Sequence, residues 1–447
     1  MIDLTASERR DLLRTTLETR ILCLDGATGT GLQDRNLTPE DFGGEELDGC
    51  NENLILTRPD VIRDLHSMYL HAGADIVETN TFGATPLVLA EYDLQAKTYE
   101  INKLGAQIAR EACAAFTDRP RWVAGSMGPT TKAISVTGGV TFDELIWNFR
   151  EQAKGLLDGG ADYLLLETCQ DTRNIKAGII AIRDLARERG EDVPIAVSGT
   201  IEPMGTMLAG QNAESLTVSV AHVPLLYIGL NCATGPEFMA DHLRAISELA
   251  QVPVACVPNA GLPDEDGNYL ETPQMVAAAV ARFARQGWIN VVGGCCGTSA
   301  AHIEALARVA ESSTPRPVLK HTRALYSGVD WVEATEDNRP LLVGERTNVI
   351  GSRRFKRLIV EEQWERASEI ARAQVKKGAH IIDVCLANPD REELQDTRLF
   401  LDQVINKVKA PLMIDSTDAA VIEEALKYCQ GKAIINSINL EDGEERF

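Results

Sequence analysis

The first part of the chain repeats one pattern, a short apolar segment followed by a stretch long enough for a helix. A segment that is apolar throughout predicts a strand buried on both faces, and alternation of such strands with helices predicts a parallel sheet. Eight repeats over about 300 residues predict a closed (β/α)8 barrel. The expected strands lie at residues 21–25, 75–79, 122–126, 162–167, 194–198, 227–232, 253–257 and 289–293.

The alternation breaks near Ser312 and restarts near Leu341. Residues 312–317 read Ser-Ser-Thr-Pro-Arg-Pro and polar residues follow them, which predicts a linker over residues 316–340. We therefore expect an α/β protein in which a barrel over residues 1–315 is followed, over residues 341–447, by a second, incomplete (β/α) barrel of about four units. Its expected strands lie at residues 341–345, 380–384, 411–415 and 432–437, and its expected helices at 361–377, 394–407 and 419–429.

Charge and composition exclude several classes of partner. The 447 residues carry a net charge of −22, so we expect no binding to nucleic acid or to an anionic membrane surface. The polar N-terminal residues predict a helical segment and not a signal peptide, and no apolar run reaches the roughly 18 residues of a membrane span. Ten cysteines in a chain this long are not a disulfide framework and predict a reducing, cytoplasmic location.

Three cysteines follow expected strands and form the most specific chemical pattern. Cys295 and Cys296 are adjacent between glycines, after the eighth expected strand, and Cys232 ends the sixth. Neighbouring cysteines rarely meet the geometry of a disulfide, but both thiols can face one soft metal ion if the glycines allow a tight turn. Three thiolates at strand ends predict a zinc site whose fourth position is open, as in catalytic zinc centres. The alternative is that the three thiols are small core side chains.

Polar and glycine-rich motifs follow the expected strands of both parts of the chain. The first set of motifs is Leu24-Asp25-Gly26-Ala27-Thr28-Gly29-Thr30, Glu78-Thr79-Asn80-Thr81-Phe82, Gly125-Ser126-Met127-Gly128-Pro129, Leu166-Glu167-Thr168, Gly229-Leu230-Asn231-Cys232 and Gly293-Gly294-Cys295-Cys296-Gly297. The second set is Gly344-Glu345-Arg346-Thr347-Asn348, Asp383-Val384, Met413-Ile414-Asp415-Ser416 and Ile435-Asn436-Ser437. These motifs resemble those in the N-terminal part of cobalamin-dependent methionine synthases. Residues 1 to 315 resemble the homocysteine-binding barrel, a fold shared with betaine–homocysteine methyltransferases, and residues 341–447 resemble the start of the pterin-binding barrel.

The resemblance implies methyl transfer to the zinc-bound thiolate of L-homocysteine, giving methionine. No catalytic residue is expected beyond this zinc-activated substrate thiolate. Asp25 and Glu167 are candidates to bind the ammonium group of homocysteine, because a buried carboxylate needs a partner. Backbone N–H groups near Gly125 and Ser126 are candidates for its carboxylate. Asn231 is also a candidate residue of the homocysteine site, where we expect it to position the loop that carries Cys232.

In the second barrel, the resemblance implies a site for the pterin ring of methyltetrahydrofolate. The edge of that ring offers hydrogen-bond donors and acceptors, so carboxylate and amide side chains at strand ends are suited to it. The candidate residues are Asp415, Asn436, Asp383, Glu345 and Asn348. Members of the family often carry an Asn two residues after the Asp of the second strand, whereas this chain has Cys385 there.

The resemblance also implies that methyltetrahydrofolate is the ultimate methyl donor and that methylcobalamin carries the methyl group. The cobalamin-binding and reactivation domains and the later strands of the pterin barrel are absent from the sequence, so we expect a fragment whose cobalamin domain acts in cis or in trans. One alternative is a cobalamin-independent methyltransferase that uses a betaine or sulfonium donor. Another is a zinc-stabilised scaffold without catalysis, which requires a fourth protein ligand such as His222.

Overall fold

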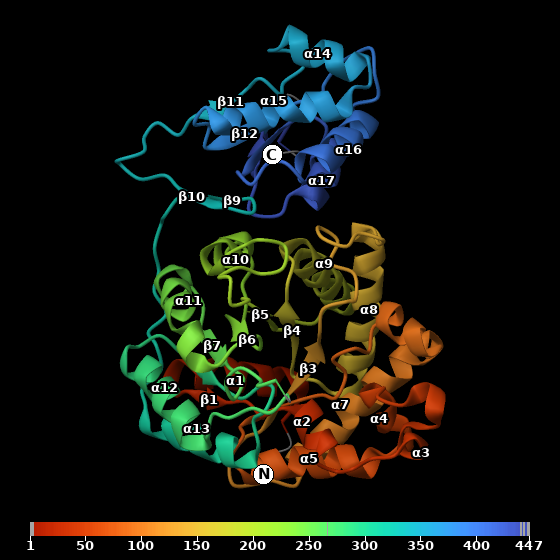
Figure 1. Ribbon diagram of the computed structural model, residues 1–447, viewed down its shortest axis with the longest axis vertical. Helices are drawn as coiled ribbons and strands as arrows, with labels where there is room; N and C mark the ends of the chain where they lie inside the picture. Colours follow the sequence, from red (N-terminus) through yellow and green to blue (C-terminus); the bar gives the residue numbers. More distant parts are fainter. Residues whose placement is uncertain (1–3, 266, 439, 441–442, 445–447) are drawn as a thin grey trace. The chain divides into compact units, whose positions relative to one another are not determined.

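The computed structural model describes residues 4–265, 267–438, 440 and 443–444 of the chain. It divides into two compact units (Figure 1). The first unit comprises Met1–Leu208 and Val223–Lys320, and the second comprises Ala209–His222 and His321–Phe447. In the part that the structure describes, no helix is both long enough and apolar enough to span a membrane.

Eight parallel strands form the barrel of the first unit, which confirms the predicted fold. Their order follows the chain, with β1 paired to β8. A parallel bridge between Leu24 and Ile76 joins β1 to β2 and brings the two ends of the sheet together. The strands are β1 (Leu22–Cys23), β2 (Ile76–Glu78), β3 (Trp122–Met127), β4 (Tyr163–Cys169), β5 (Ile195–Gly199), β6 (Tyr227–Asn231), β7 (Val254–Val257) and β8 (Val291–Val292).

Helices cover the outside of this barrel (Figure 1), each beginning after the carboxyl end of a strand, as right-handed β/α crossovers require. The longer helices are α5 (Pro59–His71), α7 (Thr98–Ala114), α8 (Phe142–Gly159), α9 (Thr172–Arg189), α11 (Pro236–Leu249), α12 (Pro273–Arg285) and α13 (Ala300–Ser312). Short helices in the loops after β1 and β2 are α2 (Thr28–Gln33), α3 (Pro39–Phe42), α4 (Leu54–Thr57) and α6 (Pro86–Leu89).

The N-terminal helix α1 (Ala6–Thr19) packs against the interior of the barrel at the amino ends of the strands. Leu13 and Leu17 are buried in the same cluster as Trp122, whose indole N–H donates to the carbonyl oxygen of Arg9 at 3.0 Å. The carboxyl ends of the strands lie at the opposite end of the barrel, which is the end where active sites of such barrels form.

The second unit has its own parallel sheet of four strands, in the order β11-β12-β13-β14. This confirms the four predicted β/α units. The elements are β11 (Val343–Gly344), α14 (Arg353–Val360), α15 (Trp364–Lys376), β12 (Ile381–Val384), α16 (Glu393–Val404), β13 (Leu412–Asp415), α17 (Ala419–Tyr428) and β14 (Ile434–Asn436).

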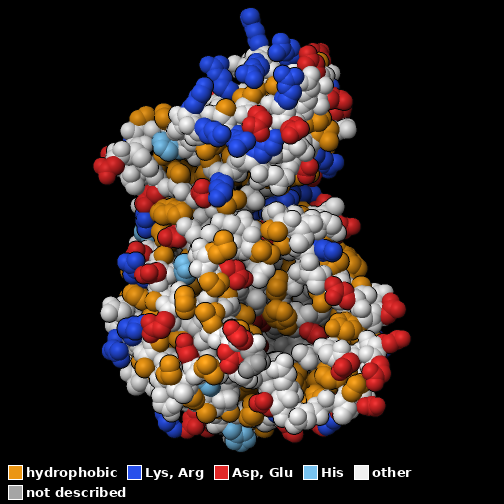
Figure 2. All heavy atoms as spheres, in the orientation of Figure 1, with side chains coloured by type: hydrophobic (Ala, Val, Ile, Leu, Met, Phe, Trp, Pro, Cys, Tyr) orange, Lys and Arg blue, Asp and Glu red, His pale blue; other side chains and the backbone are white. Residues whose placement is uncertain are grey.

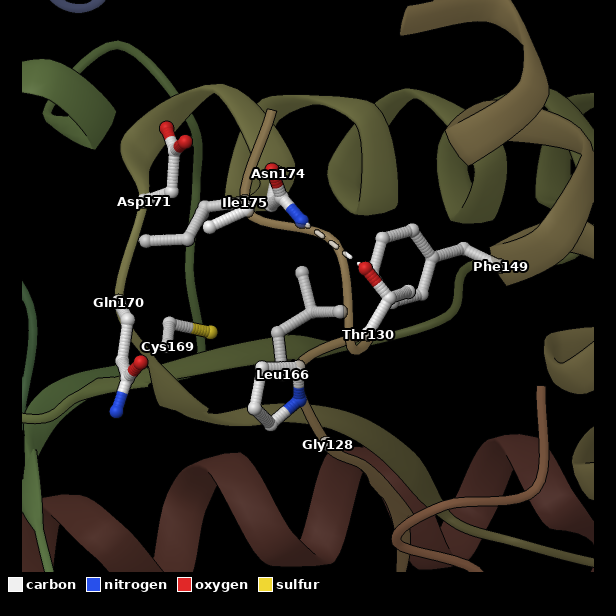
Figure 3. Close-up of a pocket in the computed structure, with 11 residues that line it drawn as sticks. Gly128, Thr130, Phe149, Leu166, Cys169, Gln170, Asp171, Asn174 and Ile175 are labelled. Atoms are coloured by element: carbon white, nitrogen blue, oxygen red, sulfur yellow. Dashed lines mark hydrogen bonds between the residues drawn. The ribbon is translucent and has the colours of Figure 1, made fainter. Parts of the chain in front are cut away.

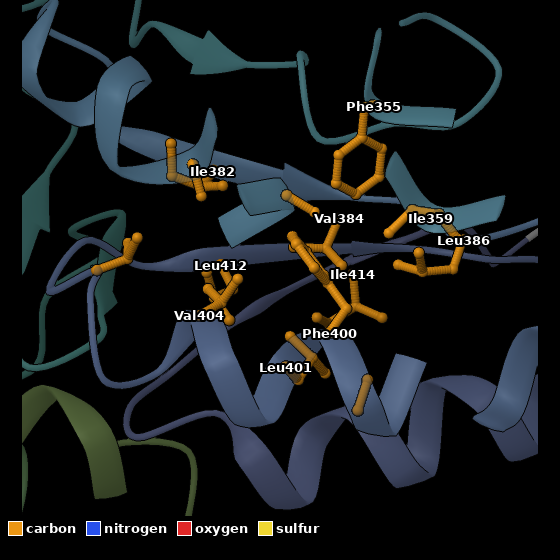
Figure 4. Packing of buried hydrophobic residues seen from close by; sticks show 14 of the residues in the cluster. Phe355, Ile359, Ile382, Val384, Leu386, Phe400, Leu401, Val404, Leu412 and Ile414 are labelled. Carbon is orange, nitrogen blue, oxygen red and sulfur yellow. The ribbon is translucent and has the colours of Figure 1, made fainter. Parts of the chain in front are cut away.

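The core of the second unit is made by side chains from this sheet and its helices (Figure 4). Phe355 of α14 and Phe400 of α16 meet edge to face, with ring centroids 5.0 Å apart. Leu358 and Ile359 are buried in the same cluster, so one face of α14 is fixed against the core.

The segment predicted to be a linker contains an antiparallel hairpin, β9 (Leu325–Ser327) and β10 (Trp331–Glu333). Ser327 binds Lys432 through two hydrogen bonds, at 3.1 and 2.9 Å. The hairpin therefore belongs to the second unit, as does α10 (Ala213–Val220), where Ser219 bonds to Ser327 at 3.1 Å. Arg316, near the start of the same segment, is bound to carbonyl groups at the end of α11 in the first unit.

Candidate functional site

The three predicted zinc ligands lie together at the carboxyl ends of β6 and β8. The sulfur atoms of Cys232, Cys295 and Cys296 all lie within 4.8 Å of one another, and those of Cys232 and Cys296 are 3.8 Å apart. All three side chains are only partly buried, so the group is accessible. Among the described residues this is the group suited to hold a metal ion, and it contains no histidine.

Two tight turns aim these thiols at one point. Cys232 and Ala233 have φ angles of +63° and +59°, a left-handed conformation that non-glycine residues rarely adopt. Gly297 has a φ of +78°, and a Cβ there would lie 2.2 Å from the ring of Tyr269. A Cβ on Gly294 would lie 2.3 Å from the hydroxyl oxygen of Thr298. The glycines of this motif are therefore required by close packing as well as by backbone conformation.

The cysteine turn is tied to the neighbouring strand β7. The Cys295 N–H donates to the Pro258 carbonyl at 2.8 Å, and the Ala260 N–H donates to the Cys296 carbonyl at 2.9 Å. Asn259 lies between these two bonds, and its Oδ1 atom is buried without a hydrogen-bond partner among the described residues. An unsatisfied buried acceptor beside a metal-binding group is uncommon. Asn259 belongs to none of the sequence motifs, although its place just after an expected strand is a signal for a site residue.

The three thiols share protons through hydrogen bonds. Bonds from Cys232, Cys295 and the Tyr269 hydroxyl lower the pKa of Cys296 to about 3. The pKa of Cys295 is raised well above its ordinary value, first by its bonds to the other two thiols and then by burial. A metal ion bound to this group would take the place of the protons now donated to the Cys296 thiolate, because a coordinating thiol is deprotonated.

Asn231 connects the end of β6 to the end of β4. Its side-chain oxygen accepts the Thr168 N–H at 2.9 Å, and its amide nitrogen donates to the Thr168 hydroxyl at 2.7 Å. Thr168 has a φ of +52°, which is strained for a β-branched residue. Asn231 is buried and directly precedes Cys232, so it positions both the cysteine and the loop that follows Glu167.

Three carboxyl groups, Asp25, Glu78 and Glu167, meet near the thiols at the ends of β1, β2 and β4. The Glu78 N–H donates to Asp25 at 3.0 Å, and the Ser126 hydroxyl donates a short bond to Glu167. Burial raises the pKa of Asp25 and of Glu78 well above their ordinary values, and the Glu167 charge raises both further. Burial also raises the pKa of Glu167, to about 7, against the lowering effect of the Ser126 bond.

Buried carboxyl groups at the other end of the barrel are paired with arginine side chains. Asp162 forms ion pairs with Arg9 and Arg110, and Asp75 forms ion pairs with Arg20 and Arg119. Among the described residues, no basic side chain shifts the pKa of Asp25, Glu78 or Glu167. A buried negative charge without a partner is costly, so this group of acids is suited to receive a cation from outside the chain.

The turn after β3 differs from the expectation that its N–H groups would bind a carboxylate. The Ser126 N–H donates to the Thr79 hydroxyl at 2.9 Å, and the Gly128 N–H donates to the Phe82 carbonyl at 3.0 Å. These two donors are already engaged. Gly125 is a packing position, since a Cβ there would lie 2.6 Å from Leu164. Ser126 contributes through its hydroxyl, which orients Glu167.

A cavity of about 50 Å³ lies beside this turn (Figure 3). Thr130 and Asn174 bond across it at 3.3 Å, and the side chains of Leu166, Cys169 and Ile175 surround it (Figure 3). A space of this size holds only a few water molecules. None of the three clustered thiols lines it, so it is separate from the candidate metal site.

In the second unit, Asn348 brings two of the predicted pterin residues together. Its amide nitrogen donates to Asp383 and to Asp415, at 3.1 Å each. Burial raises the pKa of Asp383 to about 6, and the charges of Asp415 and Glu345 add to this effect. Asn436 is the register partner of Asp415 on β14, whereas Glu345 is exposed beside them. All five candidates thus lie at the carboxyl edge of this sheet.

Two neighbours of this site have structural roles. Cys385 is buried, and its backbone exchanges hydrogen bonds with Thr347 and Val349, which hold the loop carrying Asn348. Gln374 accepts the Arg346 N–H at 2.6 Å and donates to the Thr347 hydroxyl at 3.3 Å. No sequence motif pointed to Gln374, which reaches the loop from α15.

Comparison with known families agrees with this division into two sites. A family model described as homocysteine S-methyltransferase matches residues 22–310, and one described as pterin binding enzyme matches residues 344–447. The two domains occur in the order found in the N-terminal half of methionine synthases, which confirms the predicted resemblance.

Solved structures of the homocysteine methyltransferase MmuM from Escherichia coli are similar to the first part of the chain. The metallated form is 26% identical over 65% of this chain and 96% of that chain, with a TM-score of 0.51. The oxidized form is 23% identical over 64% of this chain and 95% of that chain, with a TM-score of 0.51. At 23% identity, the similarity to the oxidized form shows a shared fold alone.

Proposed function

The chain belongs to the homocysteine S-methyltransferase family, and from this premise we propose that it methylates the thiolate of L-homocysteine held by zinc on Cys232, Cys295 and Cys296. The family match makes the chain a methyltransferase. The identity of the metal, the position of the amino acid and the source of the methyl group are parts of the proposal.

The observation that carries the proposal is the geometry of the three thiols. Tetrahedral zinc with Zn–S bonds of about 2.3 Å holds its sulfur ligands about 3.8 Å apart, and the sulfurs of Cys232 and Cys296 are 3.8 Å apart. Three partly exposed ligands leave one coordination position for a substrate. Zinc bound there would supply a deprotonated, nucleophilic substrate sulfur at neutral pH.

The chain's own residues then bind and orient the amino acid. Asp25, Glu78 and Glu167 form the anionic pocket for the ammonium group, which offsets the cost of their burial. Ser126 fixes the Glu167 carboxyl, and Asn231 holds the loop of Glu167 and the Cys232 turn in one arrangement. The substrate sulfur would form a bond to the methyl carbon as the bond between that carbon and the donor breaks, and the donor would leave with the bonding electron pair. The product, methionine, is a neutral thioether and would be a weaker metal ligand than the thiolate.

We propose methyltetrahydrofolate as the ultimate donor, with cobalamin, carried by a domain outside this sequence, transferring the methyl group. The pterin-binding match and the Asn348–Asp383–Asp415 group support this route. The second candidate is direct transfer from a betaine or sulfonium donor. It is favoured by the likeness to the homocysteine methyltransferase MmuM, because 96% of that chain corresponds to only part of this chain.

A donor comparison separates the two candidates. The zinc-loaded protein is incubated with L-homocysteine and either methylcobalamin, betaine or a trialkylsulfonium salt, and methionine is measured by chromatography. We expect methionine with methylcobalamin only, and none from the Cys296→Ala variant. Methionine formed from betaine or the sulfonium at a higher rate than from methylcobalamin would replace the cobalamin route with the direct one.

A further inference from the structure

Tyr269 is a polar side chain beside the three thiols that has no role in the reaction as proposed so far. Its hydroxyl group is hydrogen-bonded to the sulfur of Cys296. Its ring packs on the next residue of the cysteine turn, since a Cβ on Gly297 would lie 2.2 Å from that ring. A tyrosine hydroxyl keeps its proton at neutral pH, so Tyr269 donates in this bond and the sulfur accepts.

The loop between β7 and α12 turns back on itself and carries Tyr269. Pro263 and Tyr269 pair as an antiparallel bridge. Between them, the Asp264 N–H donates to the Asn268 carbonyl at 2.9 Å, and the Asn268 N–H donates to the Asp264 carboxylate at 2.8 Å. These bonds fix the direction in which the Tyr269 side chain leaves the loop.

The base of this loop is tied to the cysteine turn itself. The Ala260 N–H donates to the Cys296 carbonyl at 2.9 Å, and the Ala260 carbonyl accepts the Glu271 N–H at 3.1 Å. The Glu271 carbonyl is bonded in turn to Nε2 of His302 at 2.9 Å, in the first turn of α13. The position of the Tyr269 hydroxyl group is therefore set by the same loop bonds that hold Cys296.

The proposed site brings several thiolates together, and only one of them must react. With homocysteine bound as proposed, the substrate sulfur shares one metal site with the sulfurs of Cys232, Cys295 and Cys296. The thiolate is the reactive form of a thiol, so each of these sulfurs competes for the methyl group. Methyl transfer to a cysteine sulfur would convert a metal ligand into a thioether and would stop further turnover.

Burial does not protect the three cysteine sulfurs. Cys232, Cys295 and Cys296 are partly exposed, whereas the other cysteines of the chain are buried. Figure 2 shows the first unit hollowed within the ring of barrel elements that Figure 1 labels. Because a small methyl donor can reach these sulfurs, the choice of the methyl acceptor depends on how nucleophilic each sulfur is.

We propose that Tyr269, by donating a hydrogen bond to the Cys296 sulfur, keeps Cys296 a metal ligand and prevents it from accepting the methyl group. This inference rests on the proposed zinc site and the proposed homocysteine reaction. A hydrogen bond to a thiolate stabilises the charged form, and the nucleophilicity of a thiolate falls as that form is stabilised. Tyr269 acts only through Cys296, so it is a positioning residue.

Methyl iodide tests this proposal on the zinc-loaded protein. An attacking cysteine sulfur forms a bond to the methyl carbon as the carbon–iodine bond breaks, and iodide leaves with the bonding electron pair. Peptide mass spectrometry follows the methylation of Cys232, Cys295 and Cys296, and fragmentation distinguishes the two adjacent cysteines. In Tyr269→Phe, which keeps the ring, we expect Cys296 to be methylated about three- to ten-fold faster, because a hydrogen bond to a charged group is lost.

Cobalt(II) in place of zinc gives a second readout that does not depend on methyl transfer. A coordinating sulfur that loses a hydrogen bond gives up electron density more readily. The sulfur-to-cobalt absorption bands of Tyr269→Phe therefore move to longer wavelength than those of the unmodified chain. Circular dichroism and the urea midpoint check that the variant is folded.

Tyr99→Phe is the matched control, because it also removes a hydroxyl group bonded to a charged side chain of the first unit. The Tyr99 hydroxyl donates to Asp158 at 2.9 Å, between the outer helices α7 and α8. This variant keeps the Cys296 methylation rate and the cobalt spectrum of the unmodified chain. A Tyr269→Phe variant that matches Tyr99→Phe in either measurement would overturn the role of Tyr269 alone.

The same samples test the proposed function separately when L-homocysteine is added to them. Methionine formed no faster than without protein would overturn the proposed function, whatever the rate at Cys296. Failure of the unmodified chain to bind either zinc or cobalt would overturn the proposed metal site and this inference with it.

Discussion

Replacing Asn231 with Ala tests whether one buried amide positions the metal-binding thiols. The change removes both hydrogen bonds to Thr168, at 2.9 and 2.7 Å. Each bond is worth about 1 kcal/mol, and the Thr168 N–H left unpaired adds a similar cost, so we expect a loss of about 2–3 kcal/mol in the free energy of unfolding. Relaxation of the left-handed Thr168 backbone limits the loss to this range.

The same change displaces the Cys232 turn, which directly follows Asn231. We expect zinc affinity to fall about 10–100-fold, as when a residue that orients a metal ligand is removed. Urea unfolding followed by fluorescence measures the first effect, and competition with a chromophoric chelator measures the second. Asn231→Asp keeps an acceptor for the Thr168 N–H, so its loss of stability is smaller.

Asn212→Ala is a suitable control, because Asn212 is the N-cap of α10 and accepts the Ser215 N–H at 2.8 Å. It costs about 1 kcal/mol in stability and leaves zinc affinity unchanged. Zinc affinity at the unmodified level in Asn231→Ala, with stability reduced by no more than in this control, would refute the positioning role of Asn231.

Three further predictions concern separate parts of the molecule. Burial holds the pKa of Glu167 at about 7, so the homocysteine affinity of the zinc-loaded protein, measured by calorimetry, rises as pH increases through this value, and Glu167→Gln removes this rise. The stability of the protein without ligand changes in the opposite direction. A raised carboxyl pKa contributes stability that is full below the ordinary value of 4.5 and is lost as pH rises through 7. Asp415→Asn weakens methyltetrahydrofolate binding by about ten-fold, because it removes a charge-assisted hydrogen bond to the ring, and leaves homocysteine binding unchanged; equal folate affinities in a fluorescence titration would remove Asp415 from the site. Arg316→Ala leaves the carbonyl groups of Ser247, Ala250 and Val252 without the guanidinium that now binds them and lowers the unfolding free energy of the first unit by about 2–4 kcal/mol; an unchanged urea midpoint would contradict this.

The barrel could be predicted from sequence because its strands are apolar on both faces and regularly spaced. The expected strand at 162–167 appears as β4, and the expected strand at 227–232 appears as β6. The meeting of Cys232 with Cys295 follows from the same topology, since parallel strands of a barrel end on one face. Strand ends and residue types were therefore enough to place these thiols near one another.

The contacts that refine the site were not readable from sequence. Tyr269 reaches Cys296 from a loop, and no periodic pattern fixes where a loop side chain points. The Thr168 conformation depends on Asn231, which lies 63 residues away in the chain. The N–H groups of Ser126 and Gly128 matched a glycine-rich anion site in sequence, but the structure uses both of them to hold the loop after β2.

X-ray absorption at the zinc edge, with the metal content of the purified protein, tests the central claim most directly. The spectra are recorded with and without L-homocysteine. We predict one zinc per chain with three sulfur ligands and one lighter ligand, changing to four sulfur ligands when homocysteine is added. Absence of zinc, or a sulfur count that homocysteine does not change, would contradict an open thiol-activating site on Cys232, Cys295 and Cys296.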